Sequence, residues 1–398
     1  MKENTVYLLH DILVYKKNKN SMELVVVSDN YPSDRKPNKG AFVYNLVQEL
    51  SLYHNITVIA PFKIRDLFNP KSKEGYGKER CKVHRPLFVS ISNKKILGIN
   101  TGIWSRYFIA KAVNRCLNSL PVKPDMIYAH FISNALSGLS YVKKHSIPLV
   151  IASGESSYPV TLKAWKKDIQ DLKDCTNHFI CVSETNKKGL IALGFNENKM
   201  TVIPNAVNYS LFKPLDKGSC KEKLDIPNNK FVVGFVGNFI HRKGPNRIIE
   251  AIKQLADKDI QLVCVGGKGG LTANDFTKVI PPVSNYQLPE IYNAFDIFVL
   301  PTLNEGHCNA IEEAKACCIP VVSSKGTTVE KQINVRNGIL IDPKNILEIS
   351  EAILFLKNNA EKRTDIIKNL ENERNTNSLE ERAKLINTVL DRSNKRNE

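Results

Sequence analysis

The amino-acid sequence predicts an α/β protein with two parallel-sheet domains. Apolar runs of strand type alternate with amphipathic helical segments in both halves of the chain, which is typical of parallel sheets covered by helices. The length of 398 residues exceeds what a single hydrophobic core ordinarily spans. Polar residues recur where the expected strands end, as they do when a ligand site lies along the carboxyl edge of a parallel sheet.

The first half is expected to comprise an N-terminal extension over 1–21 and a parallel-sheet domain over 22–214. The loop DNYPSDRKPNKG follows the first expected strand and ends at Gly40, where the missing side chain would let a ligand approach the backbone. This single glycine is not the GxGxxG fingerprint of dinucleotide-binding proteins. A helix is expected over 41–53, and the expected strands cover 22–28, 55–60, 125–129, 148–152, 179–182 and 200–203.

His130 directly follows the expected strand 125–129. A histidine in such a place either packs as a structural side chain or contacts a ligand, and the sequence leaves both roles open.

The net charge of +17 lies almost wholly in residues 1–215. Such a field favours an anionic partner, whether nucleic acid, a phosphate-bearing substrate or an acidic membrane surface, and the alternative is a lysine-rich solubilising surface. No nucleic-acid recognition motif accompanies the charge, so no nucleic-acid partner is expected. The segment 96–117 adds Trp104 and Phe108 to Arg106, Lys111 and Arg115, which suits either the headgroup layer of a membrane or a helix packed on its own sheet.

The distribution of apolar and cysteine residues favours a cytoplasmic protein, with peripheral attachment to the inner face of the cell membrane as a further expectation. No apolar run reaches the roughly 18 residues needed to span a bilayer. The nearest candidate, 5–15, is interrupted by His10 and Asp11 and lacks a signal-peptide pattern. The nine cysteines show no metal-binding spacing and are expected to be reduced thiols.

The second half repeats the alternation after a polar, irregular segment, 204–230, which is expected to link the domains. A second parallel-sheet domain is expected over 215–376. Ser378 and Glu381 form a capping box that opens a final helix within 377–398, expected to pack back on the first domain. The expected strands cover 231–236, 261–265, 297–300, 320–323 and 338–341, and the expected helices 246–256, 288–295, 310–316, 346–358 and 360–375.

The stretch LPTLNEGHCNAIEEAKA, 300–316, is the most informative in the chain. A strand, a glycine-containing turn and a helix start present free backbone N–H groups to a phosphate. The carboxylates of Glu305 and Glu313 can accept hydrogen bonds from sugar or ribose hydroxyls, whereas Glu312 is expected to be a solvated helix carboxylate. Arg242 and Lys243 stand before the helix 246–256, where cations would meet a diphosphate.

These stretches together resemble the GT-B glycosyltransferases, and among them the retaining family 4, the glycosyl transferases group 1. Glu305 and Glu313 match the E-x7-E motif of that family, followed by the usual Ala314 and Pro320-Val321-Val322. Three further stretches match its patterns: VIPNAVNYSLFKP (202–214), VGNFIHRKGPNRIIEAI (236–252) and NGILIDP (337–343).

The resemblance implies two Rossmann-like domains facing a central cleft. It implies a retaining hexosyltransferase that moves a sugar from a nucleotide-sugar to a glycan or lipid-linked saccharide in cell-surface polysaccharide biosynthesis. The implied catalytic residues are Glu305 on a donor-sugar hydroxyl, His130 against the donor sugar and Lys243 on the departing diphosphate. The implied nucleotide-sugar-binding residues are Arg242 (diphosphate), Gly306, His307, Cys308 and Asn309 (turn amides), Glu313 (ribose), Gly40, Gly237 and Val283 (base).

One position departs from the family pattern, because Asn238 stands where many members have arginine. Whether Arg242 replaces that cation is left open, as is a role for the chain as a non-transferring sugar-nucleotide-binding or 2-epimerase-like homologue. No metal or cofactor is expected, since no Asp-x-Asp stands at a strand end and cations with helix N-termini can stabilise the leaving diphosphate.

Overall fold

The computed structural model describes residues 21–71, 76–91, 95–96, 99–100, 102–155, 158, 168–267, 269–374 and 376–395. The expected extension 1–21 lies outside these residues, apart from residue 21. Contacts divide the described chain into two compact units, one with the residues up to Ile203 and those from Ala383, the other Pro204–Arg382. The division falls earlier than the expected boundary at 214, because Val207 and Phe212 are buried in the core of the second unit.

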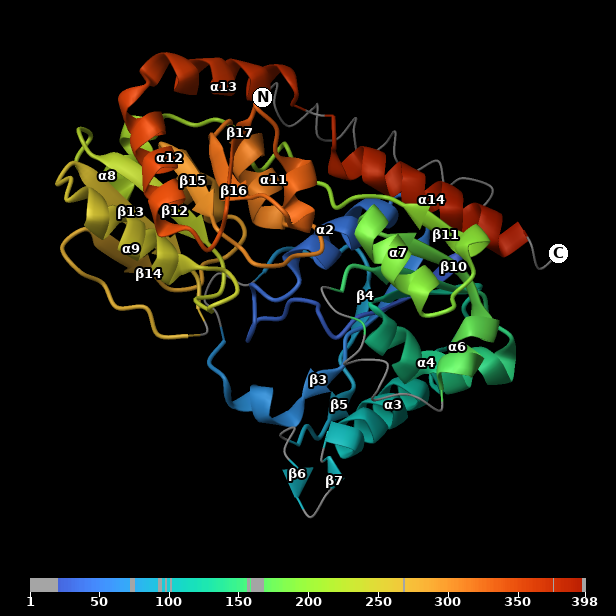
Figure 1. The fold of residues 1–398 in the computed structure, drawn as a ribbon. Coiled ribbons are helices and arrows are strands. Elements are labelled where there is room, and N and C mark those ends of the chain that lie inside the picture. Colours follow the sequence, from blue (N-terminus) through green and yellow to red (C-terminus); the bar gives the residue numbers. More distant parts are fainter. Residues whose placement is uncertain are drawn as a thin grey trace, which may run out of the picture. The chain divides into compact units, whose positions relative to one another are not determined.

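The first unit is built on a seven-stranded parallel sheet with the order β11-β10-β9-β8-β1-β2-β4 (Figure 1). The inner strands β1, β8 and β9 are buried on both faces, which explains their nearly continuous apolar sequences, whereas the edge strand β4 is largely exposed. They are β1 (Glu23–Val27), β2 (Asn55–Ile59), β4 (Lys82–His84), β8 (Met126–His130), β9 (Leu149–Ser153), β10 (Thr176–Cys181) and β11 (Met200–Val202).

Helices cover this sheet and supply most of its core contacts. Val113 and Leu117 of α3 pack with Ala135 and Leu139 of α4 against Val25 of the sheet. The helices are α2 (Ala41–Leu50), α3 (Gly102–Asn118), α4 (Ile132–His145), α6 (Ile169–Cys175) and α7 (Glu184–Ala192). Short elements complete the unit: β3 (Phe62–Lys63), η1 (Ile64–Phe68), β5 (Leu87–Phe88), β6 (Lys95–Ile96), β7 (Ile99–Asn100) and η2 (Glu197–Lys199).

Two expectations for the first unit need correction. The helix expected from residue 96 begins at Gly102, since Lys95–Ile96 pairs with Ile99–Asn100 as an antiparallel hairpin. The glycine-containing sequence LGINTG is a poor helix former, which accounts for the later start. His130 is the last residue of β8 and pairs with Ala152 of β9, rather than following the strand.

The second unit is built on a six-stranded parallel sheet with the order β14-β13-β12-β15-β16-β17 (Figure 1). Counted along the chain this is the order 3-2-1-4-5-6 of Rossmann-type domains. The strands are β12 (Phe231–Val236), β13 (Ile260–Val265), β14 (Thr277–Ile280), β15 (Ile297–Leu300), β16 (Val321–Ser324) and β17 (Gly338–Ile341). The helices are α8 (Lys217–Lys223), α9 (Pro245–Leu255), α10 (Leu288–Asn293), α11 (Asn309–Ala316), η3 (Thr328–Gln332), α12 (Ile346–Asn358), α13 (Ala360–Asn372) and α14 (Leu379–Lys395).

The predicted α/β class with two parallel-sheet domains is confirmed. The segment expected to be an irregular linker contains α8, which begins at the cap Asp216, whose side chain accepts a hydrogen bond from the Ser219 amide (2.8 Å). From Ala383 on, α14 belongs to the first unit, where burial lowers the pKa of His54 beside Asp391. Within the described part of the chain, no helix is long and apolar enough to cross a bilayer.

Candidate active site

The strand order reverses at one place in each sheet, between β1 and β8 in the first and between β12 and β15 in the second. In open parallel sheets, ligands bind outside the carboxyl ends of the strands at such a switch point. The loops after β12 and β15 carry most of the candidate residues. Gly40 follows β1 and His130 ends β8, so both lie at the switch point of the first sheet.

Three charged side chains meet at the switch point of the second sheet. Oε1 of Glu305 lies 2.5 Å from Nζ of Lys243 and 2.6 Å from a guanidinium nitrogen of Arg242. The side chains of Glu305 and Lys243 are largely buried, whereas that of Arg242 is about one-third exposed. Burial alone would lower the pKa of Lys243, but Cys308 and Glu305 beside it outweigh this effect and raise the pKa above its ordinary value.

This cluster holds two cations in fixed positions on one carboxylate. Lys243 stays charged because Cys308 and the carboxylate of Glu305 compensate for desolvation. The arrangement also brings Arg242 beside Lys243, although the expected arginine at 238 is replaced by Asn238. A diphosphate could therefore be bound by two adjacent cations once Glu305 is drawn away from them.

Hydrogen bonds to backbone carbonyls connect the loops after β12 and β15. The Leu303 amide donates to the carbonyl of Arg242 (2.8 Å), and the guanidinium of Arg247 donates to the carbonyls of Pro301 (2.6 Å) and His241 (3.0 Å). The positions of Glu305 and Lys243 are therefore set by the same hydrogen-bonded frame.

The two helices at this switch point begin without a side-chain cap. The residues before α9 and α11 are Gly244 and Cys308, neither of which caps its helix. By contrast, α8, α12 and α13 are capped by Asp216, Asn345 and Asn359. Since the first amides of a helix have no intrahelical acceptor, the uncapped starts of α9 and α11 can donate to an anion.

Glu313 has a different environment from Glu305. It lies on α11, half-buried, and the hydroxyl of the buried Tyr292 donates to its Oε2 (2.9 Å). Burial raises the pKa of Glu313 to about 7, opposed by this hydrogen bond and by the charge of Lys243. Glu313 is a strong hydrogen-bond acceptor only in its ionised form, and this form becomes the major one as the pH rises above about 7.

The expectation that Glu312 is solvated is wrong. Its side chain is buried, and Oε1 accepts a hydrogen bond from Nε2 of Gln332 (2.7 Å) while Oε2 lies 3.3 Å from Nζ of Lys315. Gln332 lies twenty residues further along the chain, so helical periodicity alone could not reveal this partner. Glu312 is a structural carboxylate in a buried polar network.

The same glutamine determines the position of the turn before α11. The Cys308 amide donates to Oε1 of Gln332 (2.8 Å), and Nε2 of Gln332 donates back to the Cys308 carbonyl (3.1 Å). The Cys308 amide, which was among the four expected to face a ligand, is thus bound within the protein. Cys308 itself is buried, which raises the pKa of its thiol. Sequence reasoning missed Gln332, which carries no recognisable motif.

His307 lies in the same turn with its ring largely buried. Burial lowers its pKa to about 4, despite the carboxylate of Glu312 at 3.8 Å, so the ring is neutral at physiological pH. Its Nδ1 has no hydrogen-bond partner among the described residues. A buried polar atom without a partner is costly, and a ligand hydroxyl could satisfy it.

The remaining candidates of the second unit line the same edge of the sheet. Gly237 directly follows β12 with φ 153°, and a Cβ atom at this position would lie 3.9 Å from Cδ of Lys243. Asn309 begins α11, and its Oδ1 accepts a hydrogen bond from Asn205 (3.0 Å). The half-buried Val283 follows β14 and packs on the core of the second unit. Among the described residues, no hydrogen bond or ion pair joins it to Glu305, Lys243 or Arg242.

His130 is buried among aromatic side chains at the switch point of the first sheet. The rings of Phe42 and Phe131 lie 5.3 and 4.9 Å from its own. The backbone of Phe131 has φ 79° and ψ 148°, a region that non-glycine residues rarely adopt. Backbone strain of this kind clusters at functional sites, so the end of β8 has the features expected of a ligand-contacting edge.

Gly40 directly precedes α2 with φ 70° and ends the loop after β1. A Cβ atom at this position would lie 1.9 Å from the carbonyl oxygen of Asn30. The glycine is therefore required by the loop itself. Whether it also lies beside a ligand remains an expectation from the sequence.

Glu155 is a functional candidate of this edge to which no role was assigned from the sequence. Its carboxylate accepts hydrogen bonds from the Ile132 amide at the start of α4 (2.7 Å), the Ser153 hydroxyl (2.8 Å) and the Gly154 amide (3.1 Å). Burial raises its pKa, and these donors oppose the rise. The protein thus supplies its own anion to the start of α4, in contrast to α9 and α11.

Comparisons with known proteins agree with this architecture. The model of Glycosyltransferase Family 4 matches residues 40–211, and that of Glycosyl transferases group 1 matches residues 216–373. The chain is 26% identical over 353 residues to the putative teichuronic acid biosynthesis glycosyltransferase TuaC of Bacillus subtilis (strain 168), a match of 83% of this chain and 88% of TuaC. It is 28% identical over 225 residues to the UDP-Gal:alpha-D-GlcNAc-diphosphoundecaprenol alpha-1,3-galactosyltransferase of Escherichia coli, covering 51% and 58% of the two chains.

Among solved structures, Anabaena HepE in complex with UDP and glucose superposes with a TM-score of 0.71 at 18% identity, covering 93% of this chain and 99% of HepE. The two Rossmann-like sheets together with the two family matches identify the chain as a glycosyltransferase of the GT-B fold. The chain belongs to the glycosyl transferases group 1.

Proposed function

We propose that this glycosyltransferase is a retaining hexosyltransferase that takes its sugar from a nucleotide-sugar and transfers it to a glycan or lipid-linked saccharide. The observation that carries the proposal is the cluster of Glu305, Lys243 and Arg242 at the switch point of the second sheet, with Oε1 of Glu305 2.5 and 2.6 Å from the two cations. Such a cluster combines cations for a diphosphate with an acceptor for a sugar hydroxyl.

In the proposed binding mode, the diphosphate of the donor displaces Glu305 from Lys243 and Arg242 and approaches the uncapped start of α11. Glu305, released, accepts a hydrogen bond from a hydroxyl of the donor sugar. Glu313 accepts hydrogen bonds from the ribose, and Nδ1 of His307 gains a partner from the sugar. Gly40 and His130 serve the acceptor and donor sugar from the first unit, Gly237 borders the diphosphate, and Val283 borders the base.

The proposed reaction breaks the bond between the anomeric carbon and the diphosphate, with positive charge developing on the sugar. Lys243 and Arg242 stabilise the negative charge on the leaving diphosphate. The acceptor hydroxyl attacks the anomeric carbon from the face that the diphosphate leaves, and a phosphate oxygen takes the hydroxyl proton. The products are a nucleoside diphosphate and a glycoside with the anomeric configuration of the donor.

We propose that this chemistry requires no metal, because two side-chain cations and the helix starts act on the diphosphate. Activity should then persist in the presence of EDTA. Loss of activity with EDTA, restored by Mg²⁺ or Mn²⁺, would contradict this part of the proposal.

The names of the relatives direct the choice of acceptor. TuaC carries teichuronic acid biosynthesis in its name, and the E. coli enzyme acts on a diphosphoundecaprenol-linked sugar by its name. We propose a phosphate-bearing, lipid-linked saccharide of a cell-surface polysaccharide as the acceptor, reached from the cytoplasmic side of the membrane. The basic charge of residues 1–215 supports an anionic acceptor.

Donor identity can be tested by thermal stabilisation with a panel of sugar nucleotides, since a ligand bound only by the folded protein raises Tm. Transfer and slow hydrolysis are then measured with the stabilising donor. Glu305→Ala and Lys243→Ala should both lose activity, while Lys253→Ala, an exposed lysine in the last turn of α9, should retain it. Full activity in both site variants would refute the assignment, and an inverted product would refute the retaining mechanism.

A second candidate is a GT-B protein that binds or epimerises a sugar nucleotide without transferring the sugar. The exposed Asn238, in place of the arginine of many members, favours it. Formation of an epimerised sugar nucleotide in the absence of any acceptor would support this alternative and reject transfer as the main activity.

A further inference from the structure

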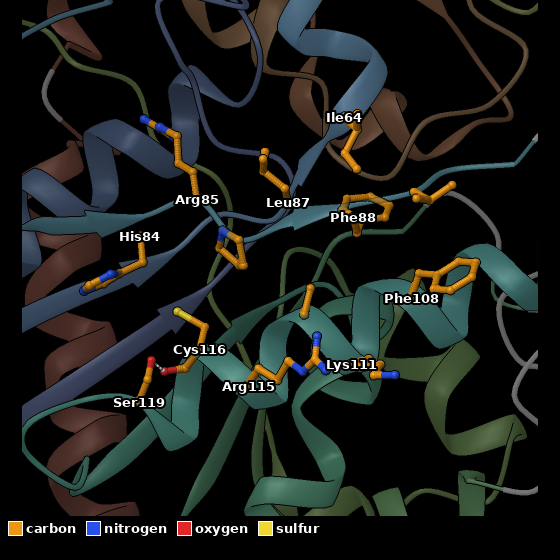
Figure 2. Close-up of a pocket in the computed structure, with 13 residues that line it drawn as sticks. Ile64, His84, Arg85, Leu87, Phe88, Phe108, Lys111, Arg115, Cys116 and Ser119 are labelled. Carbon is orange, nitrogen blue, oxygen red and sulfur yellow. Dashed lines mark hydrogen bonds between the residues drawn. The ribbon is translucent and has the colours of Figure 1, made fainter.

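A cavity of about 620 Å³ lies in the first unit between α3 and the segment that joins β4 to β5 (Figure 2). It is separate from the candidate residues at the switch point. Its apolar walls include Leu87, Phe88 and Phe108, and its polar groups include His84, Lys111 and Arg115. Figure 2 shows Lys111 and Arg115 on α3, with Leu87 and Phe88 of the β5 segment on the other side of the cavity.

The charged residues known to line this cavity are of one sign, since none of its described lining residues is acidic. Among the described residues, neither Lys111 nor Arg115 forms an ion pair, although Nζ of Lys111 lies over the ring of Tyr107 at 5.6 Å from its centroid. Arg85 also belongs to the lining, but its guanidinium donates to the Tyr76 hydroxyl (2.8 Å) and lies over the ring of Tyr31, so it is already bound within the protein. Two cations one helical turn apart, without a counter-ion, are complementary to an anion.

Large apolar side chains are exposed around the cavity. Phe68 is 84% exposed and ends η1, whose first residue, Ile64, lines the cavity. Trp104, about one turn before Phe108, is 53% exposed, and Tyr107, directly before Phe108, is 56% exposed. Leu87 and Val89 of the lining are exposed as well. Exposed aromatic and aliphatic groups gathered around a basic site are unusual for a surface that faces only water.

We propose that this face docks on an anionic membrane, with the phosphate of a lipid headgroup in the cavity. Lys111 and Arg115 bind the phosphate, and Phe68, Leu87 and Trp104 enter the headgroup layer. A free phosphate or a soluble phosphorylated glycan would explain the two cations but not the exposed apolar rim. The inference does not depend on sugar transfer, because vesicle binding needs neither donor nor acceptor.

The test uses the full-length protein and sedimentation with sucrose-loaded vesicles of phosphatidylcholine, with or without phosphatidylglycerol. Wild type should bind the anionic vesicles at low salt, bind neutral vesicles weakly, and lose most binding at high salt. Lys111→Gln with Arg115→Gln should weaken the binding on the order of 25-fold, about fivefold for each lost charge.

The matched control is Lys123→Gln with Lys188→Gln, which removes two exposed lysines of the same unit that do not line the cavity. This variant should change the affinity no more than about twofold at the same salt concentration. Equal weakening by the two double variants would show general charge attraction and overturn the proposal. Equal binding of wild type to neutral and anionic vesicles would overturn it as well.

The apolar rim is tested separately. Phe68→Ser with Leu87→Ser should weaken vesicle binding at low and at high salt alike, since burial of apolar surface is not screened by ions. In a Trp165→Phe background, the emission of Trp104 should shift to the blue on addition of anionic vesicles. The absence of a shift would reject the membrane as the partner. The binding of inorganic diphosphate is measured as well. If the Lys111→Gln/Arg115→Gln variant lost diphosphate binding but kept vesicle binding, the cavity would hold a soluble ligand and the membrane would again be rejected.

Discussion

The two sheets have the same strand order around their switch points but opposite chemistry at their carboxyl edges. In the first unit, Glu155 lies at the start of α4 and is bound by two amides and a hydroxyl of the protein. In the second unit, Glu305 is bound by two cations, and the starts of α9 and α11 carry no internal anion. At the first edge, the amide at the start of α4 donates to a carboxylate of the protein itself. At the second edge, the starts of α9 and α11 have no such internal acceptor and can donate to a ligand.

A similar structural element nevertheless positions the loops at both edges, because in each unit one buried amide side chain forms hydrogen bonds to the loop residues. In the first unit, Asn134 exchanges hydrogen bonds with Asp29 of the loop after β1 and donates to the carbonyl of His130 (2.6 Å). In the second, Gln332 binds both backbone groups of Cys308. This difference in chemistry on a similar scaffold supports our proposal that the diphosphate of the donor binds to the second unit.

The largest expected effects separate Lys243 from Glu305. Lys243→Ala should reduce transfer on the order of 10²–10³-fold, about 3–4 kcal/mol of transition-state stabilisation, and should weaken the binding of the nucleoside diphosphate. Glu305→Ala should reduce transfer similarly yet bind the nucleoside diphosphate at least as tightly as wild type, because Lys243 and Arg242 lose their internal anion. Titration calorimetry measures both affinities. A similar loss of binding in both variants would show that Glu305 organises the cations and does not compete for them.

The next effect concerns the stability of the second unit against pH. Glu313 has a pKa of about 7 in place of the ordinary 4.5, so the folded protein holds a proton that the unfolded chain has released. Stability from this group is therefore present at acidic pH and is lost as pH rises from about 4.5 to about 7, by about 3 kcal/mol.

Glu313→Gln cannot ionise and should be more stable than wild type at pH 8 by up to about 3 kcal/mol, with little difference at pH 5. Urea unfolding at the two pH values measures this. A difference that is equal at both would mean that Glu313 is ionised in the folded protein throughout.

A smaller loss is expected at Gly40. It shares φ 70° with Gly326, but a Cβ at 40 would lie 1.9 Å from the Asn30 carbonyl oxygen, whereas nothing lies within 4 Å of a Cβ at 326. Gly326→Ala should cost about 1 kcal/mol for the backbone conformation alone. Gly40→Ala should cost about 2 kcal/mol or more, since the loop must also move. Thermal unfolding compares the pair, and equal losses would mean that the loop after β1 yields without cost.

The smallest effect in the series is expected at Gln332. Its replacement by Ala removes the acceptor of the Cys308 amide and the donor to Oε1 of Glu312, which should cost about 1–2 kcal/mol and raise the KM for the donor through a loosened turn. Gln254→Ala, an exposed glutamine on α9, serves as the control and should change neither quantity. An unchanged KM in Gln332→Ala would limit this residue to stability.

Most of the fold could be predicted because each strand and each covering helix carries its own periodic signal. The helix α8 was missed, although its cap at Asp216 was a readable signal. The burial of Glu312 could not be predicted, because it depends on Gln332, which reaches α11 only after the chain has formed another strand. The pairing of Arg242 with Glu305 likewise depends on two loops that meet only in the folded sheet.

The sharing of two cations by Glu305 has a consequence for turnover. In the proposed mechanism, Lys243 and Arg242 need no ion from solution when the nucleoside diphosphate dissociates. The carboxylate of Glu305, which binds the sugar hydroxyl before release, lies close enough to pair with them again. Product release then becomes an exchange of one anion for another inside the protein. We expect the rate of release to depend little on ionic strength, and to fall in Glu305→Ala even where the nucleoside diphosphate binds well.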